Sequence, residues 1–270
     1  MAFDVSARFA LPEDHERAVL VGRIWRPDVD GPAVVAVRGA ELVDISAAAP
    51  TVRDLCEAPM PAALAMDAQG EPVGLVSDIL ANTPRATRDA TRPWLLSPID
   101  LQAVKAAGVT FAVSMLERVI EEKARGAPEL AAGIRRDVGE LIGDDLGKLK
   151  PGSKEAMALK QRLIELGMWS QYLEVGIGPD AEVFTKAPPM ATVGHLHEIG
   201  VNPASSWNNP EPEIVIVANS RGEIVGALLG NDVNLRDFEG RSALLLGKTK
   251  DNTASASLGP FVRLFDRHFS

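Results

Sequence analysis

The sequence predicts an α+β protein that is mainly β, and two observations carry this expectation. Short β-branched runs punctuated by Pro, Asp and Gly recur through residues 1–90, as in strands joined by turns. Further along, the apolar runs 214–217 and 224–229 flank a polar turn that contains Gly222, which predicts a β-hairpin. Helical periodicity is clearest in residues 153–167.

The first part of the chain is predicted to form a small β-rich domain. Its apolar runs indicate strands at 18–24, 33–37, 41–45 and 73–76, and short helices at 51–58 and 62–65. Residues 82–93 are polar and contain two prolines and three arginines, which is typical of a linker. We therefore expect a domain boundary near Trp94, which divides the chain into domains 1–93 and 94–270.

The second domain begins with signals for a helix. Ser97 is a candidate N-cap, Pro98 suits the first helical position and Asp100 suits the first turn, so we expect a short helix that ends near Gly108. The other expected elements are a helix at 114–125, a mobile or lid-like stretch at 133–149, a helix at 153–167 capped by Ser153, and strands at 182–186 and 243–246.

The predicted hairpin gathers three carboxylates at one end. Glu211 and Glu213 lie two residues apart on one strand, so their side chains share a face of the sheet. If Arg221 and Gly222 are the central pair of the turn, the numbers of cross-strand partners sum to about 443. Asp232 then lies opposite Glu211, and the three acids meet.

Three like charges so close repel one another and raise each other's pKa unless something neutralises them. A hard divalent cation bound through oxygen, such as Mg²⁺, Mn²⁺ or Ca²⁺, is the simplest neutraliser. The alternative is an exposed strand end whose acids are only solvated. Spacing alone leaves both interpretations open.

The composition limits which classes of protein this chain can belong to. The net charge of −9, without a basic stripe, argues against a nucleic-acid partner, and no run of about 18 apolar residues indicates a membrane span. Cys56 is the single cysteine, which favours a reducing cytoplasm, and the N-terminus lacks a signal-peptide pattern. His195 and His197 form an H-x-H pair without a third ligand at a recognised spacing, so zinc is not expected. We expect a cytoplasmic protein that acts on a small molecule.

Four motifs give the second half a resemblance to the fumarylacetoacetate hydrolase superfamily. They are VFTKAPP at 183–189, PEPEIVIV at 210–217, GNDVNLRD at 230–237 and GKTKDNTASASLGPF at 247–261. They occur in the family's order and at compatible distances. Two further stretches, SPIDLQAVKAAGVTFAVSMLERVIEE and SSWNNPEPE, are most similar in sequence to the 2-keto-3-deoxy sugar-acid dehydratases (xylonate and arabonate).

The resemblance implies a distorted β-sandwich or β-roll catalytic domain that holds one Mg²⁺-type ion. The family's carboxylate ligands match Glu211, Glu213 and Asp232. Its basic residues match Arg236 and Lys248, which would bind or polarise the carboxylate and keto oxygens of a 2-keto acid, and Lys186 matches a further lysine near the site. The polar loop 247–253, with Thr253 as its candidate substrate-binding residue, would hold an anionic substrate or be an ordinary connection.

One departure from the family bears on the reaction. Hydrolase members carry N-Y-x-x-H-x-x-E, whose His and Glu activate water, whereas this chain keeps Glu117 and has Ser114 in place of the histidine. The change favours a metal-dependent lyase that dehydrates a 2-keto-3-deoxypentonate to 2-oxoglutarate semialdehyde. Glu117 or Lys248 would move the proton at C3.

Two other functions stay open. One is C–C bond hydrolysis of an acylpyruvate or 1,3-diketo acid, with Ser114 and Glu117 positioning the water. The other is a non-catalytic family member, because family members continue past the GPF segment into further strands whereas this sequence stops at Ser270. A C-terminally incomplete sheet would have an open edge. The resemblance also implies a homodimer or homotetramer.

Overall fold

The computed structural model describes residues 10–108, 132–133, 136, 149–169, 171–239 and 243–270. These residues divide into two compact units, a core unit (Met1–Val104 with Thr185–Ser270) and a helical unit (Lys105–Phe184). The predicted helix at 114–125, with Ser114 and Glu117, lies outside the described residues, as does most of the predicted lid-like stretch.

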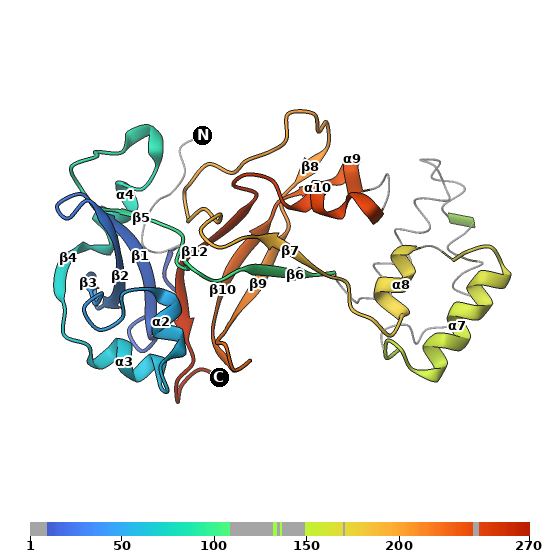
Figure 1. Ribbon diagram of the computed structural model, residues 1–270, viewed down its shortest axis with the longest axis horizontal. Helices are drawn as coiled ribbons and strands as arrows, with labels where there is room; N and C mark the ends of the chain where they lie inside the picture. The colour runs from blue at the N-terminus through green and yellow to red at the C-terminus, as the bar shows by residue number, and fades with distance from the viewer. Residues whose placement is uncertain (1–9, 109–131, 134–135, 137–148, 170, 240–242) are drawn as a thin grey trace. The chain divides into compact units, whose positions relative to one another are not determined.

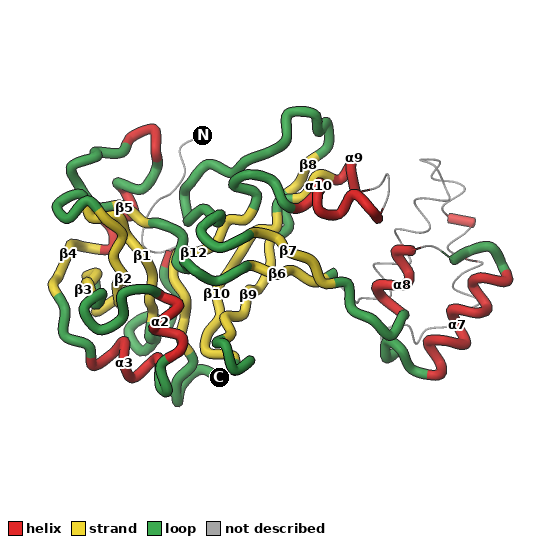
Figure 2. Tube along the Cα trace, viewed as in Figure 1, coloured by secondary structure: helices red, strands yellow, loops and turns green. Residues whose placement is uncertain are grey.

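An antiparallel sheet of eight strands organises the core unit (Figures 1 and 2). In spatial order the main path runs β4 (Glu71–Leu75), β3 (Glu41–Asp44), β2 (Gly31–Arg38), β1 (Leu20–Arg26), β12 (Ala256–Leu264), β10 (Ile224–Asp232) and β9 (Pro212–Ala218). The eighth strand, β5 (Trp94–Leu95), also pairs with β1. The mainly β expectation is confirmed, and the β-sandwich or β-roll form stays a prediction.

Apolar residues pack on both faces of this sheet because neighbouring side chains on a strand point to opposite sides. Val21 and Val34 belong to the layer that includes α2 (Val52–Glu57) and α3 (Pro61–Asp67). Leu20 and Val35, their neighbours in sequence, belong to the layer that includes α4 (Val76–Ala81). The strands and short helices predicted within residues 18–76 are thus confirmed, with end shifts of a few residues.

Strands from both halves of the chain share this sheet. β1, from the first 93 residues, pairs with β12, with Leu20 opposite Arg263. The compact units therefore follow a different division from the one at residue 93, and the boundary near Trp94 stays a prediction.

The predicted helix at 97–108 is wrong. Its last residues form the strand β6 (Val104–Ala107), which pairs with β7 (Val183–Ala187). Asp100 does not begin a helix of its own. Its carboxylate accepts the backbone N–H of Val52 at 2.8 Å and so caps the first turn of α2. A local cap pattern could not reveal that the capped helix lies 48 residues earlier.

The predicted strand at 243–246 is also wrong. Residues Ala243–Leu245 form a 3₁₀ turn and Leu246–Lys250 form α10, preceded by α9 (Arg236–Glu239). The run is apolar but consists of Ala and Leu, which favour helix over strand. Asn252 closes the helix, since its side-chain amide donates to the carbonyl of Lys248 at 3.0 Å.

The hairpin register is confirmed. From Gly226 to Asn231 the cross-strand partners on β9 run from Val217 to Pro212, so their numbers sum to 443 as predicted, and one bulge lies near the turn. The N–H of Asp232 donates to the carbonyl of Glu211 at 2.9 Å. The short strands β8 (Asn208–Asn209) and β11 (Asn234–Leu235) pair just beyond this end of the hairpin.

The helical unit contains α7 (Lys154–Glu165) and α8 (Gln171–Ile177). Ser153 is the N-cap of α7, as predicted, with its hydroxyl accepting the N–H of Ala156 at 3.1 Å. Leu163 is fully buried in the apolar cluster that the two helices share. No helix in the described part of the chain is long and apolar enough to cross a membrane.

Candidate metal and substrate site

Three carboxylates meet at the end of the hairpin where β10 closes. Glu211 precedes β9, Glu213 lies on β9, and Asp232 is the last residue of β10. One carboxylate oxygen from each lies within 4.8 Å of the other two. Hairpin geometry thus brings together the trio that the register predicts, from positions up to 21 residues apart in the sequence.

A buried lysine supports this cluster from β7. The Lys186 side chain is only 2% exposed, and its Nζ lies 2.8 Å from Oδ1 of Asp232, which is 5% exposed. Nζ also donates to the carbonyls of Val233 at 2.8 Å and Lys250 at 2.5 Å. Burial lowers the pKa of Lys186, and the Asp232 carboxylate opposes that effect. The lysine is therefore saturated with acceptors and fixes the position of Asp232.

A second lysine, Lys250 at the end of α10, bridges two of the acids. Its Nζ pairs with Oε2 of Glu211 and lies 3.0 Å from Oδ2 of Asp232. Burial by itself lowers the pKa of Lys250, but the two carboxylates outweigh it and the pKa is raised. Lys250 is thus an ammonium group held against two of the three candidate metal ligands.

Glu211 has further polar neighbours on its other oxygen. Asn234 donates to Oε1 at 2.9 Å, and Nη1 of Arg236 lies 4.0 Å away. The Arg236 guanidinium also lies 5.9 Å from the centre of the Trp207 ring. Since its side chain is 32% exposed, Arg236 is the cation of this cluster most open to a ligand.

Glu213 differs from the other two acids. Among the described residues it has no hydrogen-bond or ion-pair partner, and its side chain is half-buried. Burial and the nearby Asp232 charge raise the pKa of Glu213. The charges of Lys250 and Lys186 partly oppose this rise, but Glu213 has no direct ion-pair partner among the described side chains.

The donor set fits a hard divalent cation. All three groups are carboxylates, which Mg²⁺, Mn²⁺ and Ca²⁺ prefer, and Glu213 has no direct partner among the described side chains. The ammonium of Lys250 already bridges Glu211 and Asp232, so an incoming cation would compete with it for these oxygens. The trio is a candidate metal site, and occupancy by metal stays a prediction.

The structure does not bring every predicted site residue to the carboxylates. Lys248 is exposed, and its Nζ lies 5.0 Å from the centre of the Phe238 ring. Thr253 lines a separate cavity. Lys250 was missed, although GKTKDN contains a second lysine two residues after Lys248. Only the helical path of α10 shows that Lys250 is the one buried against the acids.

The two histidines of the H-x-H pair are partly buried in the protein. A ring nitrogen of His197 lies 2.9 Å from the carbonyl of Leu95, and burial lowers the pKa of both His195 and His197. Within the described residues, the one group with metal-ligand geometry is the carboxylate trio, which contains no histidine.

Two curated relatives resemble part of the chain. It is 44% identical over 98 residues to a "Probable 2-keto-3-deoxyxylonate dehydratase" from Haloferax volcanii, a match that covers 36% of this chain and 34% of the relative. It is 38% identical over 81 residues to a 2-dehydro-3-deoxy-D-arabinonate dehydratase from Saccharolobus solfataricus, covering 30% and 27%. The matches thus span about a third of the length of these relatives. No family model matches the chain.

Solved structures show the same fold. A 2-keto-3-deoxy-D-arabinonate dehydratase complexed with magnesium and 2,5-dioxopentanoate has a TM-score of 0.58 at 19% identity, over 91% of this chain and 66% of that one. A fumarylacetoacetate hydrolase from Exiguobacterium antarcticum has a TM-score of 0.50 at 12% identity, over 92% and 69%. The chain is thus similar in part of its sequence to two sugar-acid dehydratases, and it shares the fold of a 2-keto-3-deoxy-D-arabinonate dehydratase and of a fumarylacetoacetate hydrolase.

Proposed function

We propose that this protein is a metal-dependent hydro-lyase that dehydrates a 2-keto-3-deoxypentonate to 2-oxoglutarate semialdehyde. The observation that carries the proposal is the trio of Glu211, Glu213 and Asp232 with a lysine ammonium against it, in a chain similar to two sugar-acid dehydratases. Mg²⁺ is the proposed cation, since a structure of the same fold is a magnesium complex. We also propose a homo-oligomer in a reducing cytoplasm.

The trio would hold the cation. When bound, it would supply Lewis acidity to the carboxylate and keto oxygens of the substrate, which makes the C3–H bond more acidic. Arg236, partly exposed beside Glu211, would bind the substrate carboxylate. Lys186 is enclosed by protein acceptors, so its contacts favour a positioning role on Asp232 over contact with substrate.

Two groups would handle the protons. Glu117 would take the proton from C3, a role that comes from the family resemblance. As the C3–C4 double bond forms, the C4–O bond breaks, and the leaving hydroxyl takes a proton from the Lys250 ammonium and departs as water. The unsaturated 2-keto acid then moves a hydrogen from C5 to C3, which gives the C4–C5 enol. The enol hydroxyl proton moves to C4, and the semialdehyde results. Lys250 suits the acid role because its raised pKa keeps it protonated.

A turnover assay tests the reaction. The protein is incubated with 2-keto-3-deoxyxylonate or 2-keto-3-deoxyarabonate and Mg²⁺, and the semialdehyde is detected directly. We expect product that disappears when EDTA removes the metal. No product from folded protein, or product that survives EDTA, contradicts the proposal. Turnover of an acylpyruvate, with heavy oxygen from labelled water in the new carboxylate, would support the hydrolase alternative instead.

The two lysines of α10 give a matched pair of variants. Lys250→Gln removes the ammonium at the acids, and we expect it to lower kcat at least about a hundredfold, the contribution of one general acid. Lys248→Gln changes an exposed lysine over Phe238 and should leave kcat within about twofold, since surface changes have small effects. Steady-state kinetics on both variants checks this. The opposite ranking would assign the acid role to Lys248 instead.

A further inference from the structure

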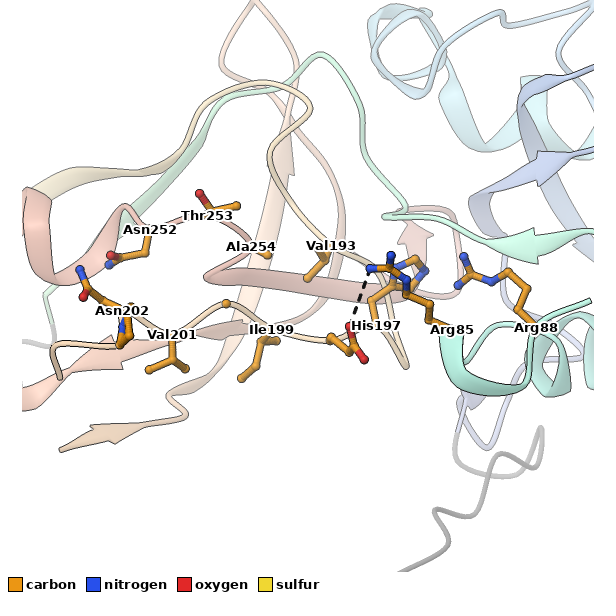
Figure 3. A pocket seen from close by; sticks show the side chains of 13 residues that line it. Arg85, Arg88, Val193, His197, Ile199, Val201, Asn202, Asn252, Thr253 and Ala254 are labelled. Carbon is orange, nitrogen blue, oxygen red and sulfur yellow. Dashed lines mark ion pairs between the residues drawn. The ribbon is translucent and has the colours of Figure 1, made fainter. Parts of the chain in front are cut away.

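A cavity lies in the core unit, outside the carboxylate cluster (Figure 3). Its volume is about 860 Å³, which is large enough for a small organic molecule. Three parts of the chain line it: the turn around Arg85 and Arg88, residues 193 and 197–203, and residues 252–254. None of the three candidate metal ligands is among the lining residues.

One end of the cavity is cationic. Arg88 is held in place there by the Trp94 ring, whose centre lies 4.7 Å from the guanidinium carbon, and by its hydrogen bond to the carbonyl of Thr83. Arg85 is 80% exposed, and its single ion-pair contact among the described residues, with Glu198, is long at 4.0 Å. An exposed pair of this length contributes little, so the Arg85 guanidinium is available to a ligand.

The charge of the lining suits a monoanion. Two arginines face one glutamate, so the lining carries one net positive charge in a protein whose overall charge is −9. His197 adds no charge at neutral pH, because burial and Arg88 lower its pKa. A phosphate dianion would be incompletely balanced by this set, whereas a single carboxylate matches it.

The other end of the cavity offers neutral hydrogen-bonding groups. Asn202, Asn252 and Thr253 line it, and Ile199 and Val201 form an apolar wall beside them (Figure 3). The Asn252 amide nitrogen already donates to the carbonyls of Lys248 and Thr249, so Asn252 offers its oxygen as an acceptor. The Asn202 oxygen accepts the N–H of Ala204, so Asn202 offers its amide as a donor. Together with the Thr253 hydroxyl, these groups match the hydroxyl groups of a polyol. The two ends together require a molecule with a carboxylate at one end and hydroxyls at the other.

The wall of the cavity is well fixed. Gly200 donates its N–H to the carbonyl of Ala254 at 2.9 Å, and a Cβ at Gly200 would lie 1.8 Å from the carbonyl oxygen of Thr253. Behind the same loop, the Ser255 hydroxyl donates to the carbonyl of Lys250 at 2.8 Å. Through Ser255, the segment that follows the cavity lining is thus hydrogen-bonded to Lys250 of the carboxylate cluster.

We propose that this cavity is a second, metal-independent binding site for a small polyhydroxy monocarboxylate, with Arg85 and Arg88 at the carboxylate and Asn202, Asn252 and Thr253 at the hydroxyls. The site lies outside the proposed reaction centre and does not depend on a metal. It would let the protein sense or hold a sugar acid while the carboxylate cluster is occupied or empty.

Isothermal titration calorimetry on the full chain in EDTA tests this proposal. The probes are D-xylonate, its neutral counterpart xylitol, and acetate, which lacks the hydroxyls. We expect xylonate to bind, xylitol to give no measurable heat and acetate to bind at least about tenfold more weakly, as each lost set of polar contacts costs affinity. A folded protein that does not bind xylonate, or that binds xylitol as well, overturns the proposal.

Three variants test whether xylonate binds in this cavity. Arg85→Met should weaken xylonate binding about three- to fivefold, the scale of one exposed charge contact. Arg92→Met, an exposed arginine outside the lining, is the matched control and should bind as the wild type does. Glu211→Gln should retain xylonate binding. Loss of binding in Glu211→Gln, or equal affinities of Arg85→Met and Arg92→Met, would overturn the assignment to this cavity, whatever the turnover assay shows.

Discussion

Replacing Glu213 with glutamine is expected to weaken metal binding strongly while leaving the metal-free protein at least as stable as the wild type. Glu213 has no described partner, and burial and Asp232 raise its pKa, so its charge opposes folding. Removing that charge relieves repulsion within the trio. The same change removes one of three oxygen ligands, and we expect Mg²⁺ affinity to fall at least about a hundredfold and turnover at least about a thousandfold.

Two measurements separate these opposite effects. Calorimetric titration with Mg²⁺ or Mn²⁺ reports the affinity, and urea unfolding in EDTA reports the free energy of unfolding without metal. Glu223→Gln is the matched control, because this exposed glutamate lies in the turn of the same hairpin and pairs with Arg221 at 2.9 Å. A Glu213→Gln protein that binds metal normally would refute the site. One that is much less stable in EDTA would show that Glu213 has a stabilising partner.

The gathering of the acids could be predicted because it depends on local rules. Side-chain alternation fixes which face Glu211 and Glu213 share, and the turn around Gly222 fixes the register. The bulge near the turn did not disturb the prediction, since the numbers of cross-strand partners sum to 443 from Gly226 onward. A hairpin needs no information from the rest of the chain, and so its far end was predictable.

The lysines could not be assigned in the same way. Lys186 precedes the hairpin by more than 20 residues. It lies on β7, which pairs with β6, and its contact with Asp232 depends on the tertiary fold. Lys250 and Lys248 differ by two positions, which on a strand would place both on one face but on a helix turns them far apart. Since the segment before them was expected to be a strand, the two lysines could not be told apart from the sequence pattern.

Asp100 shows a third limit. Its position after Ser97 and Pro98 has the form of a helix start, yet its carboxylate serves the first turn of α2. Capping groups are recognised from sequence only when they lie beside the helix that they cap. The eight-stranded sheet likewise depends on the pairing of β1 with β12, across more than 200 residues.

Replacing Lys186 with methionine is expected to lower the free energy of unfolding by about 3–5 kcal/mol, the cost of removing one partner of a buried ion pair. Methionine fills a similar volume but leaves Oδ1 of Asp232 without its ammonium partner at 2.8 Å, and the carbonyl of Val233 without its donor. Urea unfolding in EDTA measures the loss. Lys248→Met, which changes an exposed lysine, should shift the free energy by less than about 0.5 kcal/mol.

A double variant tells whether charge or packing causes the loss. Lys186→Met combined with Asp232→Asn removes both buried charges, so it should be more stable than Lys186→Met alone if the unpaired carboxylate is the cost. If the double variant is less stable than the single one, Asp232 is held mainly by Lys250, at 3.0 Å, and Lys186 stabilises the carbonyl groups instead. An unfolding curve of Lys186→Met that matches the wild type would refute the buried ion pair as the support of this site.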